Sequence, residues 1–220
     1  MPGYLTQQTA VAIAGVADLQ IRSLLNQQQF HDPLNVAADR GISSAMWPLF
    51  GLLWPSGLCL AERLGQRAVR PERVLELGCG LGLASLVGHR LGANVTASDC
   101  HPLAAAFLAE NLRLNDLGPM PFQHGQWGEF ESRVTGRFDL VIASDVLYER
   151  DEQGTLAHFI DQHCAESAEV WVVDPNRANR PAFHRHMRHW GFEMSEVFLH
   201  RPSLTGQTDY RGRMLTYQRR

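Results

Sequence analysis

Two carboxylates flank a run of three glycines in the first half of this 220-residue sequence. The residues are Glu76, then Gly78, Gly80 and Gly82, and finally Asp99. An apolar stretch precedes the glycines and another precedes Asp99, as expected for two buried strands with a helix between them. A strand that runs into such glycines turns where the backbone can approach a ligand closely. A carboxylate after the second strand can bind both hydroxyls of a ribose, so the pattern predicts a nucleoside-binding turn.

The spacing of the glycines and the charge beside them favour one class of nucleoside. Dinucleotide-binding turns follow the pattern G-x-G-x-x-G, and Leu83 stands where the third glycine of that pattern would lie. Glu76 lies two residues before the first glycine, where it would repel a pyrophosphate. S-adenosylmethionine carries an ammonium, a sulfonium and a ribose but no phosphate. Glu76 and Asp99 together therefore predict S-adenosylmethionine and disfavour a nicotinamide dinucleotide.

From residue 73 onward the predicted strands and helices alternate, which is typical of a parallel sheet covered on both faces. Strands are expected at 74–77, 93–98, 122–124, 138–143, 170–174, 193–200 and 213–217, the last two as an antiparallel edge pair. Helices are expected at 58–64, 83–90, 102–115, 151–164 and 182–190. Before them the pattern predicts an exposed strand over 19–24 and a segment rich in aromatic residues, proline and glycine over 45–57.

Ligands of an open parallel sheet bind beyond the carboxyl ends of its strands, and two more groups of residues lie at such ends. The third strand is followed by Gln126, Trp127 and Gly128, and the fourth by the stretch 144–148. Trp127 is expected either to stack on an adenine or to be a core aromatic near the surface. Asp145 follows the fourth strand directly, and one interpretation is that it caps the next helix or turn.

These motifs together resemble the seven-strand S-adenosylmethionine-dependent methyltransferases, and more narrowly methyltransferase family 16, whose members are mostly protein lysine methyltransferases. That family has an acidic-x-x-tyrosine motif after its fourth strand, matched by Asp145 and Tyr148, and a tryptophan before its first strand, matched by Trp54. The resemblance implies a three-layer, doubly wound, seven-stranded and mostly parallel α/β sheet of the Rossmann-like methyltransferase type. It covers 54–220, and we expect 1–53 to be an N-terminal extension or lid.

The resemblance also implies a role for each matching position. Contacts with the methyl donor are expected from Trp54, Glu76, Gly78, Cys79, Gly80, Gly82, Asp99, Trp127 and Ser144, with Cys79 and Ser144 acting mainly through backbone groups. Asp145 would orient the acceptor amine by a hydrogen bond, and Tyr148 would form a wall of the acceptor channel. Enzymes that methylate base amines or glutamine amides usually carry two prolines in this loop, where Val146 and Leu147 stand here. The loop therefore favours a lysine side chain of a protein as the acceptor.

Three other functions remain open at this point. One is the methylation of a small-molecule amine, a second is a scaffold that binds the cofactor without catalysis, and a third, disfavoured by Glu76 and Leu83, is a nicotinamide-dependent reductase. The histidines at 184, 186 and 189 could suggest a metal, but they do not share one helix face and arginines flank them, so no metal is expected.

Composition indicates which classes of partner and which cellular compartment to expect. The net charge of -3 gives no general reason to expect nucleic acid, and no apolar run is long enough to span a membrane. The four cysteines form no C-x-x-C pair, and two of them lie beside the predicted cofactor turn, which favours reduced thiols in the cytoplasm. All 20 lysine-or-arginine positions are arginine, and the chain has no lysine.

Overall fold

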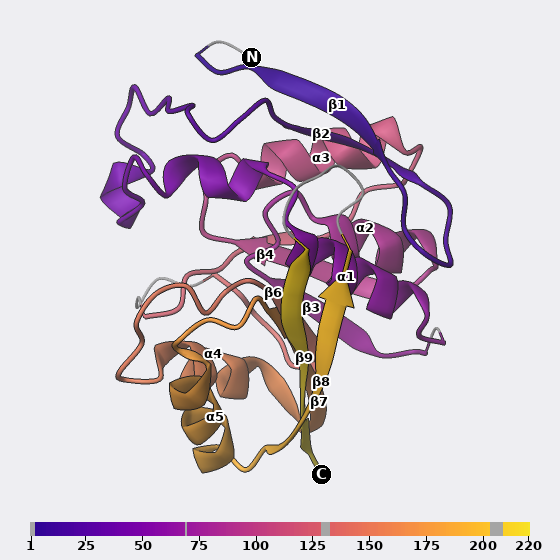
Figure 1. Cartoon of the computed structure of the whole chain (residues 1–220), viewed down its shortest axis with the longest axis vertical. Helices are drawn as coiled ribbons and strands as arrows, with labels where there is room; N and C mark the ends of the chain where they lie inside the picture. The colour runs from indigo at the N-terminus through magenta and orange to yellow at the C-terminus, as the bar shows by residue number, and fades with distance from the viewer. Residues whose placement is uncertain (1–2, 69, 129–132, 203–208) are drawn as a thin grey trace.

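The computed structural model describes residues 3–68, 70–128, 133–202 and 209–220 (Figure 1). Its strands are β1 (Thr6–Val11), β2 (Leu19–Leu24), β3 (Arg73–Leu77), β4 (Asn94–Asp99), β5 (Phe122–His124), β6 (Phe138–Ser144), β7 (Cys164–Asp174), β8 (Glu193–Arg201) and β9 (Tyr210–Arg219). Its α-helices are α1 (Pro55–Gly65), α2 (Leu83–Arg90), α3 (Ala104–Leu114), α4 (Thr155–His163) and α5 (Arg180–His189). Two short 3-10 helices, η1 (Ala38–Arg40) and η2 (Trp47–Gly51), lie between β2 and α1.

The main sheet has seven strands in the order β5-β4-β3-β6-β7-β9-β8. Neighbouring strands are parallel except at β9, which is antiparallel to both β7 and β8. The strand order reverses between β3 and β6, so their carboxyl ends lie at the position where open α/β sheets bind ligands. The predicted seven-stranded, mostly parallel fold with an antiparallel edge is confirmed.

Alternate residues of the central strands fill two separate cores. Val74 and Leu140 pack with residues of α1, α2 and α3 on one face of the sheet. Leu75 and Val141 pack with residues of α4 and α5 on the other face. Each such leucine, fully removed from water, stabilises the fold by about 1.5–3 kcal/mol. Glu76 follows the same alternation and faces the α2 side, because Ser85 of α2 binds its carboxylate.

The N-terminal segment departs most from the sequence expectations. The structure adds a strand, β1, that was not predicted and that pairs antiparallel with β2. The prediction that 19–24 is an exposed strand is wrong on exposure, because Leu19, Ile21 and Leu24 are fully buried.

Helix α4 begins at Thr155 instead of Asp151, since the Asp151 carboxylate accepts hydrogen bonds from the backbone N–H groups of Thr155 and Leu156 and so caps the helix.

Asn111 of α3 and Asn115, the residue that follows α3, bond the free edge of β2. The Asn115 side chain accepts from the backbone N–H of Gln20 at 2.8 Å and donates to the Gln20 carbonyl at 2.8 Å. The Asn111 side chain accepts from the N–H of Arg22 at 2.8 Å and donates to the Arg22 carbonyl at 3.4 Å. The two side-chain amides therefore form the hydrogen bonds that a neighbouring strand would otherwise form with this edge.

Aromatic rings join the same segment to the rest of the molecule. Trp47 of η2 meets the rings of Tyr4, Phe50 and His101 edge-on, with ring centroids 5.5–5.9 Å apart. Phe50 also meets Phe107 of α3 at 5.2 Å. The segment between β2 and α1 is thus packed against α3 and the residues that follow β4. Among the described residues, no helix has both the length and the apolar character that crossing a membrane requires.

We predict that Asn111→Ala lowers the free energy of unfolding by about 1–3 kcal/mol, because it removes a buried side chain that bonds partly buried backbone groups of Arg22 and the carbonyl of Leu81. Urea unfolding followed by circular dichroism measures the change. The control is Asn94→Ala, at an exposed position of β4, which should stay within about 0.5 kcal/mol of the wild type. Equal stability of the two variants would contradict the role of the α3 amides.

Candidate active site

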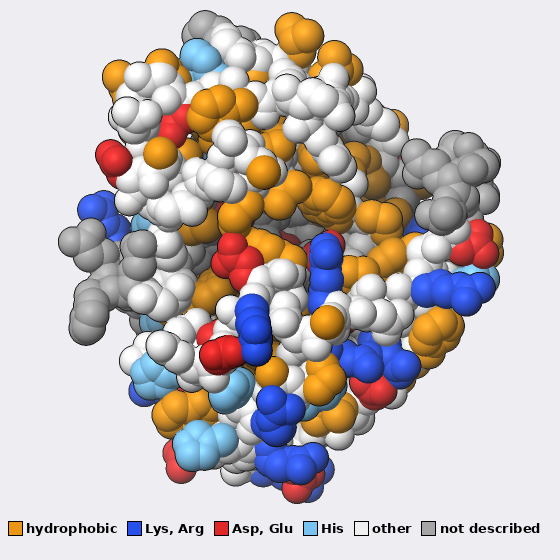
Figure 2. Space-filling model, turned by 60° about the vertical axis from the view of Figure 1, so that its left-hand side comes forward, with side chains coloured by type: hydrophobic (Ala, Val, Ile, Leu, Met, Phe, Trp, Pro, Cys, Tyr) orange, Lys and Arg blue, Asp and Glu red, His pale blue; other side chains and the backbone are white. Residues whose placement is uncertain are grey.

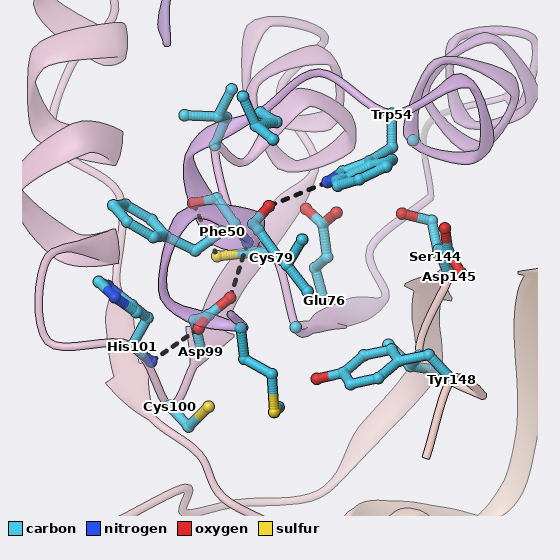
Figure 3. Close-up of a pocket in the computed structure, with 18 of the residues that line it drawn as sticks. Phe50, Trp54, Glu76, Cys79, Asp99, Cys100, His101, Ser144, Asp145 and Tyr148 are labelled. Carbon is cyan, nitrogen blue, oxygen red and sulfur yellow. Dashed lines mark hydrogen bonds between the residues drawn. The ribbon is translucent and has the colours of Figure 1, made fainter. Parts of the chain in front are cut away.

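A cavity of about 370 Å³ lies beyond the carboxyl ends of β3, β4 and β6 (Figure 3). One wall comes from the segment between η1 and α1, which supplies Ile42, Met46, Leu49, Phe50, Leu52, Leu53 and Trp54. The space-filling view shows a hollow lined largely by hydrophobic side chains, with acidic and basic side chains at its edge (Figure 2). The cavity therefore combines an apolar wall with a few charged groups that the strand ends carry.

Part of the glycine run lines this cavity. Gly78, Gly80 and Gly82 have φ angles of 60°, 53° and 74°, a region that side chains rarely adopt. A Cβ atom on Gly80 would lie 2.7 Å from the carbonyl oxygen of Phe50, so the loop touches the η2 segment directly. Gly78 and Gly80 line the cavity. Gly82, predicted to contact the donor, precedes α2 at its N-terminus and is not one of the residues that form the cavity wall.

Glu76 faces the cavity from β3 and is only 3% exposed. Its Oε2 accepts a hydrogen bond from the backbone N–H of Ser85 at 2.8 Å and another from the Ser85 hydroxyl. Burial raises the pKa of this carboxyl to about 7, although the bonds from Ser85 oppose the rise and the charge of Asp99 adds to it. Within the described ranges, Oε1 forms no hydrogen bond, so one oxygen can still bind a cation or a donor.

Asp99 lies at the end of β4 and is 6% exposed. Its Oδ2 accepts from the backbone N–H of Gly80 at 2.8 Å, and its Oδ1 accepts from that of His101 at 2.8 Å (Figure 3). Burial raises the pKa of this carboxyl, while the hydrogen bonds from His101 and Gly80 oppose the rise. Each oxygen keeps a lone pair for a further donor, as the two hydroxyls of a ribose would need.

A stacked pair of rings behind Asp99 was not foreseen. Phe50 and His101 lie 3.7 Å apart between ring centroids with an angle of 11° between the rings, and both line the cavity. His101 Nδ1 accepts from the N–H of Leu103 at 3.2 Å, which leaves the ring proton on Nε2. Burial lowers the pKa of His101 to about 3, so the ring is neutral. Only the aromatic density near residue 50 could have indicated this contact.

Asp145 and Tyr148 meet the cavity at its other end. Asp145 has a left-handed backbone, with φ at 55°, and its N–H donates to the Val173 carbonyl at 2.8 Å. Its Oδ1 accepts from Nε of Arg177 at 2.9 Å and lies 2.8 Å from Nη2 of the same residue. Asp151, not Asp145, binds the first backbone N–H groups of α4, so Asp145 does not cap that helix. Tyr148 is 42% exposed, at the opening of the cavity.

The other predicted donor contacts also lie around this cavity. Trp54, Cys79, Trp127 and Ser144 all line it. The indole N–H of Trp54 donates to the Leu49 carbonyl at 2.9 Å, and Trp127 meets Phe159 edge-on with centroids 6.5 Å apart. Sequence reasoning missed His101 and Arg177. Arg177 could have been noticed, because it follows the carboxyl end of β7.

The histidines of α5 are not assembled into a ligand set. His184 instead shares a hydrogen bond of 2.6 Å with the hydroxyl of Tyr217 in β9. In the part of the chain that the structure describes, no three histidine, cysteine, aspartate or glutamate side chains are placed to hold a metal ion.

We predict that Glu76→Gln changes the pH dependence of stability. The folded-state pKa of Glu76, about 7, exceeds its ordinary value of 4.5, so the folded protein holds a proton there that the unfolded chain releases. The stability that this proton confers is complete below about pH 4.5 and is lost as pH rises through about 7. Relative to Glu76→Gln, the wild type should lose on the order of 3 kcal/mol over this interval in urea unfolding without ligand. Parallel pH profiles of the two proteins would contradict the raised pKa.

Comparison with known proteins identifies the family. A family model described as lysine methyltransferase, that of methyltransferase family 16, matches residues 34–189. The chain is 29% identical over 215 residues to the electron transfer flavoprotein beta subunit lysine methyltransferase of Rattus norvegicus, which covers 92% of this chain and 78% of that protein. It is 30% identical over 183 residues to the protein N-lysine methyltransferase METTL21A of Mus musculus, which covers 77% of this chain and 84% of that protein.

Solved structures agree on the fold. A SAM-dependent methyltransferase from Agrobacterium tumefaciens superposes with a TM-score of 0.64 at 17% identity, covering 98% of this chain and 71% of that one. The 16S rRNA N2 G1207 methyltransferase of T. thermophilus, solved with AdoMet and guanosine, gives 0.62 at 20% identity, covering 98% of this chain and 51% of that one. The family that the motifs resembled is thus confirmed. The chain belongs to methyltransferase family 16 and is an S-adenosylmethionine-dependent lysine methyltransferase.

Proposed function

We propose that this enzyme methylates a lysine side chain of the β subunit of electron transfer flavoprotein, with Asp145 and Tyr148 in contact with the acceptor amine. The observation that carries the proposal is that these two residues line the same cavity as Glu76 and Asp99, with Tyr148 exposed at its surface. One cavity thereby offers a donor end and an acceptor end on the same side of the sheet.

The residues of the donor end fit S-adenosylmethionine. The cofactor supplies a methyl group on a positively charged sulfur, which is already activated for displacement. Asp99 has two oxygens directed at a site next to the glycine loop and would bind the ribose hydroxyls. Glu76 has one free oxygen for the ammonium. Gly78, Cys79 and Ser144 would contribute backbone groups, and the rings of Trp54 and Trp127 would enclose the remaining faces.

Gly82 contributes indirectly to the same end of the cavity. Its N–H donates to the Cys79 carbonyl at 2.7 Å, which closes the turn around Gly80. A Cβ atom at this position would lie 2.5 Å from the side chain of Leu108, so a larger residue would displace the loop from α3. We therefore assign Gly82 to the shape of the donor loop.

The residues of the acceptor end fit an amine that attacks as the neutral form. An ordinary lysine has a pKa of about 10.4 and must lose its proton before it can attack. Asp145 would accept a hydrogen bond from the amine through Oδ2 and hold the nitrogen lone pair toward the methyl group. Tyr148 would restrict the amine on a second side, and burial raises the pKa of its hydroxyl, which therefore stays neutral. Such alignment can supply several kcal/mol of the rate enhancement, of a possible ~7–11 kcal/mol for well-oriented reactants.

The exposure of this end supports a protein as substrate. Tyr148 is 42% exposed, and Leu53, which lines the same cavity, is 37% exposed. A lysine on a protein surface can reach such an opening, whereas a small amine would be held better by a closed chamber. The segment 42–53, which forms one wall, would act as a lid between donor and substrate, and this is the role that we assign to the end of the N-terminal extension.

The choice of substrate rests on how far the relatives align. The rat enzyme named for electron transfer flavoprotein matches 92% of this chain, while mouse METTL21A matches 77%. The longer match extends over more of the chain, including regions outside the donor-binding motifs.

The four free cysteines support a reducing compartment such as the cytoplasm as the place of action.

We predict that Asp145→Asn lowers the transfer rate by at least about 100-fold, because the neutral amide orients the amine poorly and can donate as well as accept. Asparagine tolerates the left-handed backbone of this position, so the fold should be retained. Calorimetry should show that S-adenosylhomocysteine binds within about threefold of the wild type. Transfer at the wild-type rate would remove Asp145 from the mechanism.

The substrate is tested with purified electron transfer flavoprotein from the same source, labelled S-adenosylmethionine and mass spectrometry of the products. We expect methyl groups on lysines of the β subunit. The enzyme itself has no lysine side chain, so label on lysine must come from the substrate. Label that appears on another protein of a whole lysate, with none on the β subunit, would overturn the choice of substrate while leaving lysine methylation intact.

A further inference from the structure

We infer that Arg177 is a positioning residue for methyl transfer, which holds one oxygen of Asp145 and balances its charge so that the other oxygen can bind a neutral amine. The inference rests on the function proposed above. It adds a residue from the loop after β7 to the acceptor end, which the family motifs of the sequence do not include.

The geometry of the ion pair divides the two oxygens of Asp145. Both contacts from Arg177 go to Oδ1, at 2.9 Å from Nε and 2.8 Å from Nη2. Among residues 3–68, 70–128, 133–202 and 209–220, no hydrogen bond is formed to Oδ2. The Asp145 side chain is 15% exposed and the Arg177 side chain 41%, and both residues line the cavity. Oδ2 is therefore the oxygen that an acceptor can use.

The loop after β7 fixes the arginine in this place. The backbone N–H of Arg177 donates to Oδ2 of the buried Asp174 at 2.8 Å. Asn176 has a left-handed backbone, with φ at 63°, and its side chain donates to the Arg211 carbonyl at 3.2 Å and accepts from Nε of Arg213 at 3.1 Å. Strand β9 thus supports the turn from which Arg177 reaches Asp145.

The charge of Arg177 offsets the tendency of the Asp145 carboxylate to keep the acceptor amine protonated. A lone carboxylate beside a lysine stabilises the ammonium and so raises the pKa of the group that must lose a proton. A guanidinium paired with the same carboxylate offsets that attraction. Asp145 can then accept a hydrogen bond from the amine without retaining the proton on the nitrogen.

Other titratable groups lie on the elements around Asp145. Burial raises the pKa of Tyr148, on the same loop, and raises that of Tyr210, on β9, to about 12. Asp174, at the end of β7, also has a raised pKa because of burial. Across the cavity lie Glu76 on β3 and Asp99 on β4. Any titration of these two carboxyls is common to the wild type and to a variant at 177.

The test is Arg177→Gln, which removes the charge and keeps a neutral donor, studied by the pH dependence of kcat at saturating S-adenosylmethionine with electron transfer flavoprotein as acceptor. The acidic limb of the profile should move upward by about one pH unit, because the acceptor ammonium loses the repulsion of the guanidinium. At neutral pH kcat should be roughly tenfold lower, KM should not rise, and the two profiles should converge at high pH. Lysine is avoided at 177 because it would introduce an acceptor into a chain that has none.

The matched control is Arg113→Gln, which removes the same charge from an exposed ion pair with Glu110 on α3. It should keep the wild-type profile. A loss of kcat in Arg177→Gln that is equal at every pH, or no change, overturns the inference while the wild type still methylates lysine. A wild type that methylates no lysine of the acceptor overturns both this inference and the proposed function. Calorimetry with S-adenosylhomocysteine, within about threefold of wild type, shows that the variant is folded.

Discussion

The carboxylate of Asp99 is held almost out of contact with water by backbone amides from two different parts of the chain, Gly80 and His101. This interaction joins the glycine loop after β3 to the turn after β4, and Ser85 joins helix α2 to Glu76 of β3. Two carboxylates are thereby confined at one end of the sheet, and among the described residues no cation pairs with either. Burying a negative charge without a partner costs free energy. A ligand with a positive end and sugar hydroxyls lowers that cost, because it supplies the cation and the hydrogen-bond donors that the two carboxylates lack. The preference for a sulfonium nucleoside follows from this constraint.

At the opposite end of the cavity, the negative charge of Asp145 is paired with a positive charge of the protein itself. Asp145 meets a guanidinium from the loop after β7, so its charge is already compensated before any substrate arrives. The cavity therefore has an uncompensated donor end and a compensated acceptor end, only a few side chains apart. The difference suits the chemistry, because the donor is a fixed cation while the acceptor must be neutral when it attacks. The reversal of strand order between β3 and β6 brings the two ends together.

Local pattern predicted the central elements well and the long-range contacts poorly. Helix α2 has the bounds 83–90 that its apolar spacing indicated, and β5 covers the predicted 122–124. The burial of β2 could not be predicted, because its side chains pack with those of α3, which lies about 90 residues further along the chain and also bonds the β2 backbone through Asn111. The contact of Arg177 with Asp145 is similarly non-local, at a separation of 32 residues. Sequence therefore located the strand ends that carry chemistry, while the groups that tune them became visible only in three dimensions.

The side-chain amides at the end of α3 also connect distant regions of the chain by hydrogen bonds. Asp99 binds the backbone of His101, His101 binds that of Leu103 just before α3, and α3 ends the hairpin sheet through Asn111 and Asn115. A fluctuation that detaches the hairpin must loosen the helix that begins beside the cavity. We therefore expect that occupancy of the cavity increases the protection of the β2 amides against exchange with solvent. Exchange in the amino-terminal hairpin would then report, from a distance, whether the enzyme is loaded.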